Sequence, residues 1–374
     1  MKINKVIAGI MAVCVMGTGV PYVSIVSGNN FVIKAGAVED GTYEQLKYRN
    51  YGDYIEIYDC EQSATEVVIP SEIDGLPVTD IGENAFYECW KLTSVNIADS
   101  VKNIGALAFC YCKSLTKVNI PDSVERIGLD TFGFCSSLKS IKLPDSIKSI
   151  GDYAFYGCSN LASIEIPESL TKIGGYAFYK TLWLEEKRKE NPLVIVNEIL
   201  IDGRACVGDV TIPDDVKTIG YGAFSSNSDL TSIVIPENVV SIGEHSFGAC
   251  SELKEITFLN PECEIEGEDY TITNNFDHFN GTIYGYEDST AQVYAAKYGR
   301  SFVSLGEAPE KETATGDING DNSVSIADAV LLQKCILGSE TLTEEQFKSA
   351  DMNSDGFVDS FDMVLLRCKV VYGE

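Results

Sequence analysis

Two short segments near the C-terminus concentrate side chains that could bind a hard cation. "GDINGDNSVSIAD" covers residues 316–328, and "ADMNSDGFVDSFD" covers residues 350–362. Their carboxylate and amide side chains recur at the same offsets, 34 residues apart. Calcium in proteins is bound by six to eight oxygens of this kind, supplied at alternating positions of one loop. The spacing therefore predicts a pair of calcium sites.

Each segment matches a calcium loop in which positions 1, 3, 5, 7, 9 and 12 supply oxygens, position 7 through its backbone carbonyl. Position 6 needs a residue that accepts a positive φ, and Asn322 and Gly356 occupy it. The predicted ligands of one ion are Asp317, Asn319, Asp321, Ser323, Ser325 and Asp328. Those of the second ion are Asp351, Asn353, Asp355, Phe357, Asp359 and Asp362.

The two segments differ from ordinary helix–loop–helix calcium sites. Position 12 is Asp in both, and a linker rather than a helix precedes the first loop. Each loop runs directly into one predicted helix, "IADAVLLQKCILG" or "SFDMVLLRCKVV". A third short helix is predicted at "TEEQFKSA", where Thr343 and Gln346 have the spacing of a capping box. The pattern predicts a small all-α domain of two loop–helix units.

This duplicated unit, from Gly316 to about Tyr372, resembles a type I dockerin. The resemblance implies folding around two calcium ions and calcium-dependent binding to a cohesin module of a scaffoldin, the assembly protein of the cellulosome. In that family loop positions 10 and 11 and helix positions 17, 18 and 22 contact the cohesin. Here these positions are Ile326, Ala327, Gln333, Lys334 and Gly338, and Ser360, Phe361, Arg367, Cys368 and Tyr372. The first unit lacks the hydroxyl residues common at positions 10 and 11, so the type of cohesin stays open.

The preceding part of the chain repeats every 23 residues. An Ile-Gly pair marks the period, with isoleucines at Ile81, Ile104, Ile127, Ile150, Ile173, Ile219 and Ile242. Within one unit Leu92, Val95 and Ile97 are expected to point inward from a short strand, and Ser94 and Asn96 to point outward. A unit this short cannot bury its apolar side chains alone, so neighbouring units must stack into a solenoid.

The pattern "IPDSVxxIGxxAFxxC" resembles BspA-like leucine-rich repeats of bacterial surface and secreted proteins. The resemblance implies an α/β leucine-rich-repeat solenoid with a short strand plus a turn or short helix in each repeat. Residues 181–203 interrupt the period and are predicted to form a charged helix and a hairpin that replace one repeat. A closing helix is predicted over residues 289–298. The expected domains are a signal peptide (1–37), the repeat domain (38–305), a linker (306–315) and the dockerin (316–374).

Cysteines also follow the period. Cys89, Cys112, Cys135, Cys158 and Cys250 occupy one repeat position, which holds Thr181 and Asn227 elsewhere. Interchange of Cys, Thr and Asn indicates a small group that bonds to the backbone of the neighbouring turn. A column of disulfides is the alternative, because stacked layers bring the Cα atoms within reach.

The N-terminus has the pattern of an export signal. Lys2 and Lys5 precede an apolar run over residues 6–26, and Ala35-Gly36-Ala37 offers a cleavage site before Val38. The alternatives are an uncleaved anchor and a lipoprotein modified at Cys14. We expect a secreted, extracellular protein of the cell-surface cellulosome.

Composition and the repeat argue against several functions. The chain carries 28 Lys and Arg against 56 Asp and Glu, a net charge of −28, so nucleic acid is not an expected partner. Only two histidines, His245 and His278, are present. The acids after the repeat prolines recur in nearly every unit, so they are expected to serve the turns with the serines that follow them. We therefore expect no enzyme activity.

One row of repeat positions varies in chemistry although its place on the strand is fixed. It comprises Asn96, Asn119, Lys142, Glu165, Thr211, Val234 and Thr257. Variable side chains on a regular surface predict a binding face for a protein, a cell surface or a polysaccharide. The predicted function is that of a non-catalytic cellulosome component attached by its dockerin. The alternatives are a polysaccharide-degrading hydrolase with an unrecognised site and a structural spacer.

Overall fold

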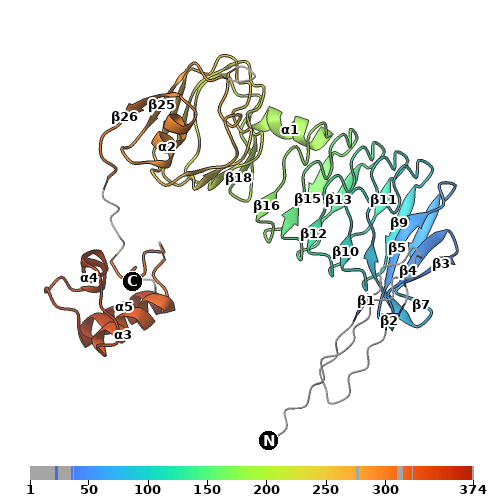
Figure 1. The fold of residues 1–374 in the computed structure, drawn as a ribbon, viewed down its shortest axis with the longest axis horizontal. Helices are drawn as coiled ribbons and strands as arrows, with labels where there is room; N and C mark the ends of the chain where they lie inside the picture. The colour runs from blue at the N-terminus through green and yellow to red at the C-terminus, as the bar shows by residue number, and fades with distance from the viewer. Residues whose placement is uncertain are drawn as a thin grey trace, which may run out of the picture. The chain divides into compact units, whose positions relative to one another are not determined.

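The structure is a computed structural model that describes residues 22–23, 35–36, 38–274, 278–309, 315–321 and 323–372 (Figure 1). Lys2, Lys5, most of the apolar run and Asn322 lie outside these residues, as does the cleavage position at Ala37. The chain divides into two compact units, residues 1–306 and 307–374. In the described ranges, no helix has the length and apolar character needed to cross a membrane.

The first unit is a solenoid whose repeats each contribute two short strands joined by turns. Within each ladder, strands of successive repeats pair in parallel and in register, as with Ile141 beside Ile164 and Ile150 beside Ile173. The first strands of the N-terminal repeats are β6 (Glu66–Ile69), β9 (Ser94–Ile97), β11 (Lys117–Val118), β13 (Ser140–Lys142) and β15 (Ser163–Glu165). The second strands are β8 (Leu76–Ile81), β10 (Asn103–Ile104), β12 (Arg126–Ile127), β14 (Ser149–Ile150) and β16 (Lys172–Ile173).

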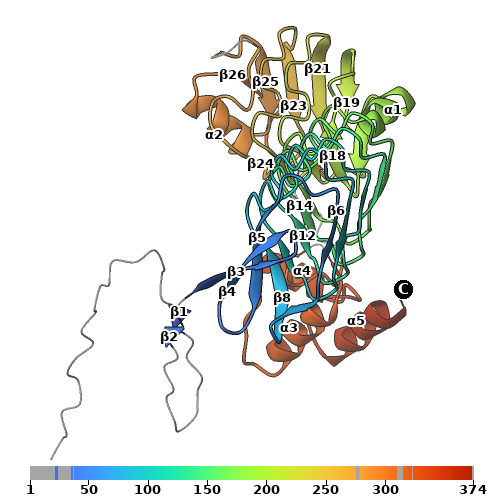
Figure 2. The same ribbon diagram turned by 90° about the vertical axis from the view of Figure 1, so that its right-hand side faces the viewer.

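The C-terminal repeats form two further ladders. The strands of the first, β19, β21, β23, β25 and β26, are parallel and lie side by side in Figure 2. Their bounds are β19 (Gly208–Thr211), β21 (Leu230–Ile235), β23 (Glu255–Phe258), β25 (Thr282–Gly285) and β26 (Ser301–Ser304). The second ladder contains β17 (Val194–Val196), β18 (Ile199–Asp202), β20 (Thr218–Ile219), β22 (Ser241–Ile242) and β24 (Glu264–Ile265). At the N-terminal end lie β1 (Tyr22–Val23), β2 (Ala35–Gly36), β3 (Glu39–Tyr43), β4 (Leu46–Asn50), β5 (Ile55–Cys60) and β7 (Glu72–Ile73).

The predicted leucine-rich-repeat solenoid is confirmed, with turns rather than helices completing the described repeats. Leu92, Val95 and Ile97 are buried, and Asn96 is exposed, as the spacing predicted. The phenylalanines that follow the Ile-Gly pairs stack through the core. Ring centroids are 4.9 Å apart between Phe86 and Phe109. Because every layer buries the same apolar positions against its neighbours, the stack supplies a core that no single repeat has.

The cysteine column is structural. The Sγ of Cys112 donates to the Phe86 carbonyl at 3.1 Å, and Cys250 donates to the Phe224 carbonyl at 3.1 Å. Thr181 and Asn227 also donate to backbone carbonyls from this position. Every cysteine of the described ranges is a free thiol. Burial raises the pKa of Cys250 to about 12, so the thiol stays protonated and remains a hydrogen-bond donor.

The serines after the repeat prolines act differently from the sequence expectation. Ser100 donates to the Val78 carbonyl at 2.7 Å, and Ser146 donates to the Val124 carbonyl at 2.6 Å. These hydroxyls therefore satisfy carbonyls of the preceding layer rather than N–H groups of their own turn. The acidic residues beside them are exposed to solvent: Asp99, Asp122, Asp145, Glu168, Asp214 and Glu237.

One acid inside the solenoid lacks a partner. The Oδ1 atom of Asp130 is buried and has no hydrogen-bond partner within the described residues, and burial raises the pKa of this carboxyl above its ordinary value. A raised pKa in the folded state means that ionisation opposes folding. This penalty is absent at pH values below the ordinary pKa and is complete above the raised one.

Asp130→Asn is therefore expected to stabilise the solenoid at neutral pH and to have no effect at pH 3. Solvent screening of this half-exposed group keeps the gain small, on the order of 0.5 kcal/mol. Urea unfolding at both pH values measures the difference. An equal gain at pH 7 and pH 3 would show that the charge of Asp130 is not responsible.

The break in the period is built as predicted. Helix α1 (Leu182–Glu190) is followed by the antiparallel hairpin of β17 and β18. The ladder that ends at β16 does not continue into β18, and the buried apolar residues fall into two clusters that meet between Ile199 and Leu200. The Asn197 side chain bridges this junction by donating to the carbonyls of Pro167 and Leu170 at 2.9 and 3.0 Å. The closing helix α2 (Thr290–Lys297) has Ser289 as its N-cap.

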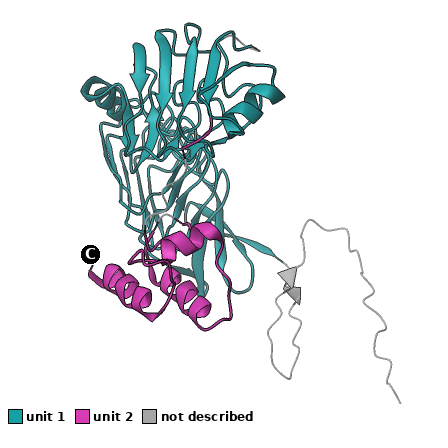
Figure 3. Ribbon diagram, turned by 90° about the vertical axis from the view of Figure 1, so that its left-hand side faces the viewer, with its two compact units in different colours: residues 1–306 teal, residues 307–374 magenta. Residues whose placement is uncertain are grey.

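The second unit, coloured separately in Figure 3, is a small helical domain. It contains α3 (Ile326–Ile336), α4 (Glu344–Ala350) and α5 (Ser360–Tyr372). Its buried core consists of Ile318, Leu332, Ala350, Met363 and Leu366. The capping box predicted for Thr343 and Gln346 is present at α4, and a second one joins Ser325 and Asp328 at α3.

Candidate functional site

Asp328 closes the first loop of the helical unit. Its side chain is completely buried. Its Oδ1 atom accepts hydrogen bonds from the backbone N–H groups of Ile318 and Asn319 at 2.8 and 2.9 Å. Its Oδ2 atom accepts from the N–H of Ser325 at 2.8 Å. One carboxylate thus joins the start of the loop to the start of α3.

Asp362 performs the same task in the second loop. It is also completely buried. Its Oδ1 atom accepts from the Met352 N–H and its Oδ2 atom from the Asp359 N–H, both at 2.8 Å. Met352 and Asp359 stand 34 residues after Ile318 and Ser325, so the sequence duplication is also a duplication of geometry.

The early positions of both loops are tied together in a matching way. Asn319 donates through Nδ2 to Asp321, and Asn353 donates to Asp355, each at 2.8 Å. The bond from Asn319, with that from the Ser323 N–H, lowers the pKa of Asp321. Asp317 accepts from the Gly320 N–H at 2.8 Å. In the second loop Gly356, which has a φ of +85°, donates to Asp351 at 2.8 Å.

The predicted ligands are therefore brought into two compact loops, but not into a tight cluster of acids. Within the described part of the chain, no group of three or more His, Cys, Asp or Glu side chains lies close enough to hold a metal ion. The carboxylates take backbone N–H groups as partners instead. The chemistry of the donors fits calcium, because both loops offer Asp and Asn oxygens and a backbone carbonyl at position 7.

The residues assigned to cohesin contact are all exposed on α3, α5 and their ends. Ile326, Phe361 and Tyr372 expose 72%, 57% and 75% of their surface. The others are Ala327, Gln333, Lys334, Gly338, Ser360, Arg367 and Cys368. Gly338, with a φ of +70°, follows the end of α3, where Ser339 donates to the Lys334 carbonyl at 2.9 Å.

Sequence reasoning missed two pairs of exposed apolar side chains on α3, its C-cap and α5. Val330 and Val364 expose 47% and 55%, and Leu337 and Val371 expose 73% and 68%. The members of each pair are 34 residues apart. The signal was present in the sequence: apolar residues recur at two matching positions of both units, although a small core cannot bury them all.

The predicted face of the solenoid is mostly exposed. Thr211, Val234 and Thr257 are neighbours across β19, β21 and β23. Lys142 and Glu165 form an exposed ion pair at 3.8 Å, a type worth little in water. Asn119 is already engaged, because its amide both donates to and accepts from the backbone of Ile97 at 2.8 Å. This row therefore contains one residue, Asn119, that is exposed and also bonds to the backbone of the preceding layer.

The two histidines have unrelated surroundings. His245 lies among aromatic rings, with its centroid 5.3 Å from that of Tyr221 and 6.0 Å from that of Tyr270. His278 is exposed, whereas Cys263, the cysteine nearest to it in the sequence, is completely buried. A buried thiol whose pKa is raised to about 12 by desolvation is not a nucleophile.

Comparison with protein families gives two matches. The model of the BspA type leucine-rich repeat region matches in six copies over residues 79–199 and 203–280, which is more than half of the chain. The model of the type I dockerin domain matches residues 315–370. None of the curated proteins matches the chain.

Two solved structures are similar to this chain. A leucine-rich repeat protein from Bacteroides ovatus is 24% identical, with 77% of this chain and 82% of that chain covered and a TM-score of 0.42. The T. pallidum leucine-rich repeat protein is 29% identical over 57% of this chain and 91% of that chain, with a TM-score of 0.40. The family matches coincide with the two compact units: the chain belongs to the family of BspA-type leucine-rich-repeat proteins and carries a C-terminal type I dockerin domain.

Proposed function

We propose that this protein is a secreted, non-catalytic component of a cellulosome. Its dockerin binds a cohesin module of a scaffoldin in a calcium-dependent way, and its solenoid binds a second ligand. Both modules are of kinds that mediate interactions, and together they are typical of extracellular or cell-surface proteins.

The observation that carries the proposal is the duplicated geometry of the two loops. Asp328 and Asp362 hold equivalent backbone groups at equal distances, which places α3 and α5 after equivalent loops. The exposed apolar pairs then add to the assigned contact residues. Exposed Val and Leu side chains at matching positions support a protein partner, because a monomeric surface gains nothing from presenting them to water.

Calcium has a defined part in this proposal. Each ion would be held by the oxygens of one loop: Asp317, Asn319, Asp321, Ser323, Ser325 and Asp328, or Asp351, Asn353, Asp355, Phe357, Asp359 and Asp362. Bound calcium supplies charge that lets several carboxylates share one small space. It would thereby fix the loops that position α3 and α5.

Titration of the full chain against a panel of cohesins, in calcium and in chelator, tests the docking. We expect binding to at least one cohesin in calcium and none in chelator. The double variant Asp317→Ala/Asp351→Ala should reproduce the effect of the chelator. The double variant Glu344→Ala/Glu345→Ala removes the same charge from α4 and should bind normally. Binding that ignores the chelator, or no binding to any cohesin, would refute the proposal.

Ligand binding by the solenoid distinguishes this proposal from the two alternatives, a structural spacer and a polysaccharide-degrading hydrolase. Pull-down of the full chain, with its dockerin already saturated by cohesin, tests whether the solenoid captures a further ligand. Capture supports a binding module, and its absence supports a spacer. Turnover of a plant polysaccharide, lost on replacement of a single carboxylate, would instead identify a hydrolase.

A further inference from the structure

A pocket of about 480 Å³ lies where the repeat period breaks. Two consecutive repeats supply its tyrosines, Tyr153 and Tyr156 from one and Tyr176 and Tyr179 from the next. Arg188 of α1 and Arg204, which follows β18, complete the charged part of its lining. Neither arginine belongs to the repeat pattern. The pocket therefore exists because the inserted segment meets a regular aromatic surface.

The tyrosine rings form a continuous aromatic surface. Tyr153 and Tyr176 are stacked with their centroids 5.7 Å apart and their planes at 18°. Tyr156 and Tyr179 are also 5.7 Å apart. All four side chains are half-buried, so part of each ring remains available to a ligand. The guanidinium of Arg204 lies 4.1 Å from the centroid of Tyr179, which fixes its position by a cation–π contact.

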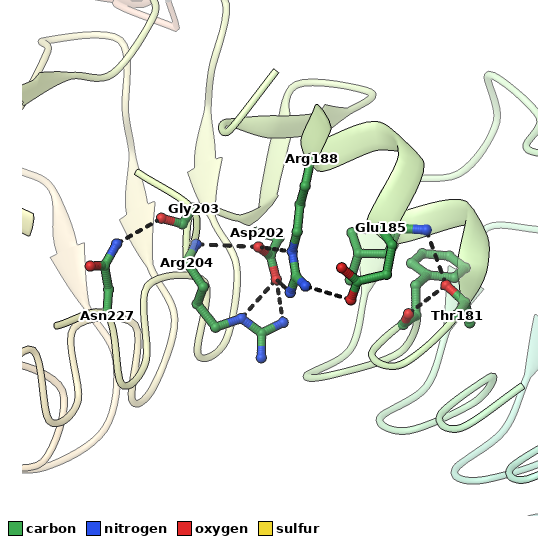
Figure 4. A network of polar contacts seen from close by, with 9 residues as sticks. Thr181, Glu185, Arg188, Asp202, Gly203, Arg204 and Asn227 are labelled. Carbon is green, nitrogen blue, oxygen red and sulfur yellow. Dashed lines mark hydrogen bonds and ion pairs between the residues drawn. The ribbon is translucent and has the colours of Figure 1, made fainter. Parts of the chain in front are cut away.

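A buried carboxylate holds both arginines (Figure 4). Asp202 is completely buried and accepts from Arg188 through Nε and Nη2 at 2.9 and 2.8 Å. It also accepts from Nε of Arg204 at 2.8 Å and from its Nη2. Arg188 uses its Nη1 for Glu185 at 2.7 Å. In the described part of the chain, the Nη1 of Arg204 has no acceptor, so this arginine is held in place and still has N–H groups to donate.

The side chains that line the pocket differ in charge from the chain as a whole. The whole chain carries a net charge of −28, yet the described lining consists of tyrosines, arginines and serines and includes no carboxylate. Lys180 lies beside it, with Nζ 5.2 Å from the ring centroid of Tyr156. Buried Asp202 and exposed Glu185 already pair with the two arginines. The Nη1 of Arg204 and the nearby Lys180 remain to pair with a carboxylate of a ligand.

The other side chains that line the pocket indicate what kind of molecule carries the carboxylate. Ser225 and Ser226 add hydroxyls to those of the tyrosines, and the described lining has no aliphatic side chain. Aromatic rings with many hydroxyl groups suit a sugar, whose C–H faces pack on rings and whose hydroxyls exchange hydrogen bonds. An apolar peptide side chain would find no aliphatic wall. An acidic peptide could satisfy Arg204 but would leave the hydroxyls without matched partners.

We propose that this pocket binds an acidic carbohydrate, namely a polysaccharide segment that contains uronic acid. The proposal rests on the proposed ligand-binding role of the solenoid and places the site at the tyrosine pocket, away from the variable strand row. The uronate carboxylate pairs with Arg204, and the sugar rings lie against Tyr156, Tyr176 and Tyr179.

Calorimetric titration of the full chain in calcium, with an oligogalacturonide as the probe, tests this assignment. We expect binding that weakens with salt, and no binding of a neutral galacto-oligosaccharide of equal length. Tyr179→Ala and Arg204→Gln should each weaken binding by about tenfold or more. Tyr87→Ala, at the repeat position of Tyr179 in a distant layer, and Arg126→Gln should leave it unchanged.

Other results would overturn the proposal. These are equal affinity for the neutral sugar, tighter binding of an Asp/Glu peptide, or no binding by the folded chain. Because Arg204→Gln removes a partner of buried Asp202, Tyr156→Ala serves as a second variant that leaves the ion pairs intact. Cohesin capture is measured on every variant. If capture persists while the oligogalacturonide fails to bind, this inference fails and the docking proposal stands.

Discussion

Asp328→Ala is expected to destabilise the dockerin unit by about 3 to 5 kcal/mol, because three backbone N–H groups lose their acceptor at once. Unsatisfied buried donors are costly, and the N–H of Ile318 belongs to a completely buried residue of the core. Among the described residues of the unit, five apolar residues form the buried core, so a loss of this size removes most of the stability of the unit. Asp362→Ala should have a similar effect.

Hydrogen exchange measured by mass spectrometry locates this loss, since peptides from α3 and α5 should exchange rapidly while those of the solenoid remain protected. Glu344→Ala is the matched control, because Glu344 is an exposed acid in the first turn of α4. Asp328→Asn keeps one carboxamide oxygen as an acceptor. Its protection of α3 is expected to lie between that of Asp328→Ala and that of Glu344→Ala. Unchanged protection of α3 in Asp328→Ala would show that the carboxylate does not close the loop.

The periodic part of the fold could be predicted because its cause is local and repeated. An apolar residue that recurs every 23 positions must meet its own copies, which places Leu92, Val95 and Ile97 inside without any knowledge of the rest. The Cys112 hydrogen bond could be predicted for the same reason. Thr and Asn replace Cys at this repeat position in other layers, and the three side chains share a small group that can form a hydrogen bond. The helix cap at Thr343 and the helix that closes the repeats were also visible as short-range patterns.

The parts of the structure that depend on three-dimensional arrangement could be predicted less well from the sequence. Asp328 and Asp362 were identified only as position 12 of calcium loops, whereas the structure shows them holding loop and helix together. Asn119 was assigned to a variable face and is exposed, but spacing did not show that its amide also bonds to the backbone of Ile97. Both assignments needed the direction of a side chain, which spacing alone does not give.

The tyrosine pocket shows why a site can be hidden in a regular sequence. The offset of 23 residues between Tyr153 and Tyr176 was readable, and so was the charged insertion. The sequence does not show that the guanidinium groups of Arg188 and Arg204 lie over these tyrosine rings. Their placement depends on Asp202, a buried acid whose role appears only once α1 and the hairpin are folded.

Asp202→Ala is therefore expected to have the largest effect within the solenoid, about 3 to 5 kcal/mol, since it leaves two half-buried guanidinium groups without their shared carboxylate. The effect on cooperativity should be equally clear. The strand ladders of the described residues are interrupted between β16 and β18, as they also are between β10 and β12. The hydrophobic core of the described solenoid continues across the earlier interruption but divides into two clusters here, between Ile199 and Leu200. In a solenoid, stability passes only between neighbouring layers, so weakening this junction separates two folding units.

Calorimetry of the full chain should show this separation as a solenoid transition that splits in two, with the part that contains residues 200–306 unfolding independently of the part before it. Asp214→Ala removes an exposed acid from the following repeat and should leave a single solenoid transition at the parental temperature. The Phe stack and the strand ladders on either side of the junction are untouched in both variants. A single, unshifted transition in Asp202→Ala would mean that Asn197 and the apolar contacts across the junction suffice to couple the two parts.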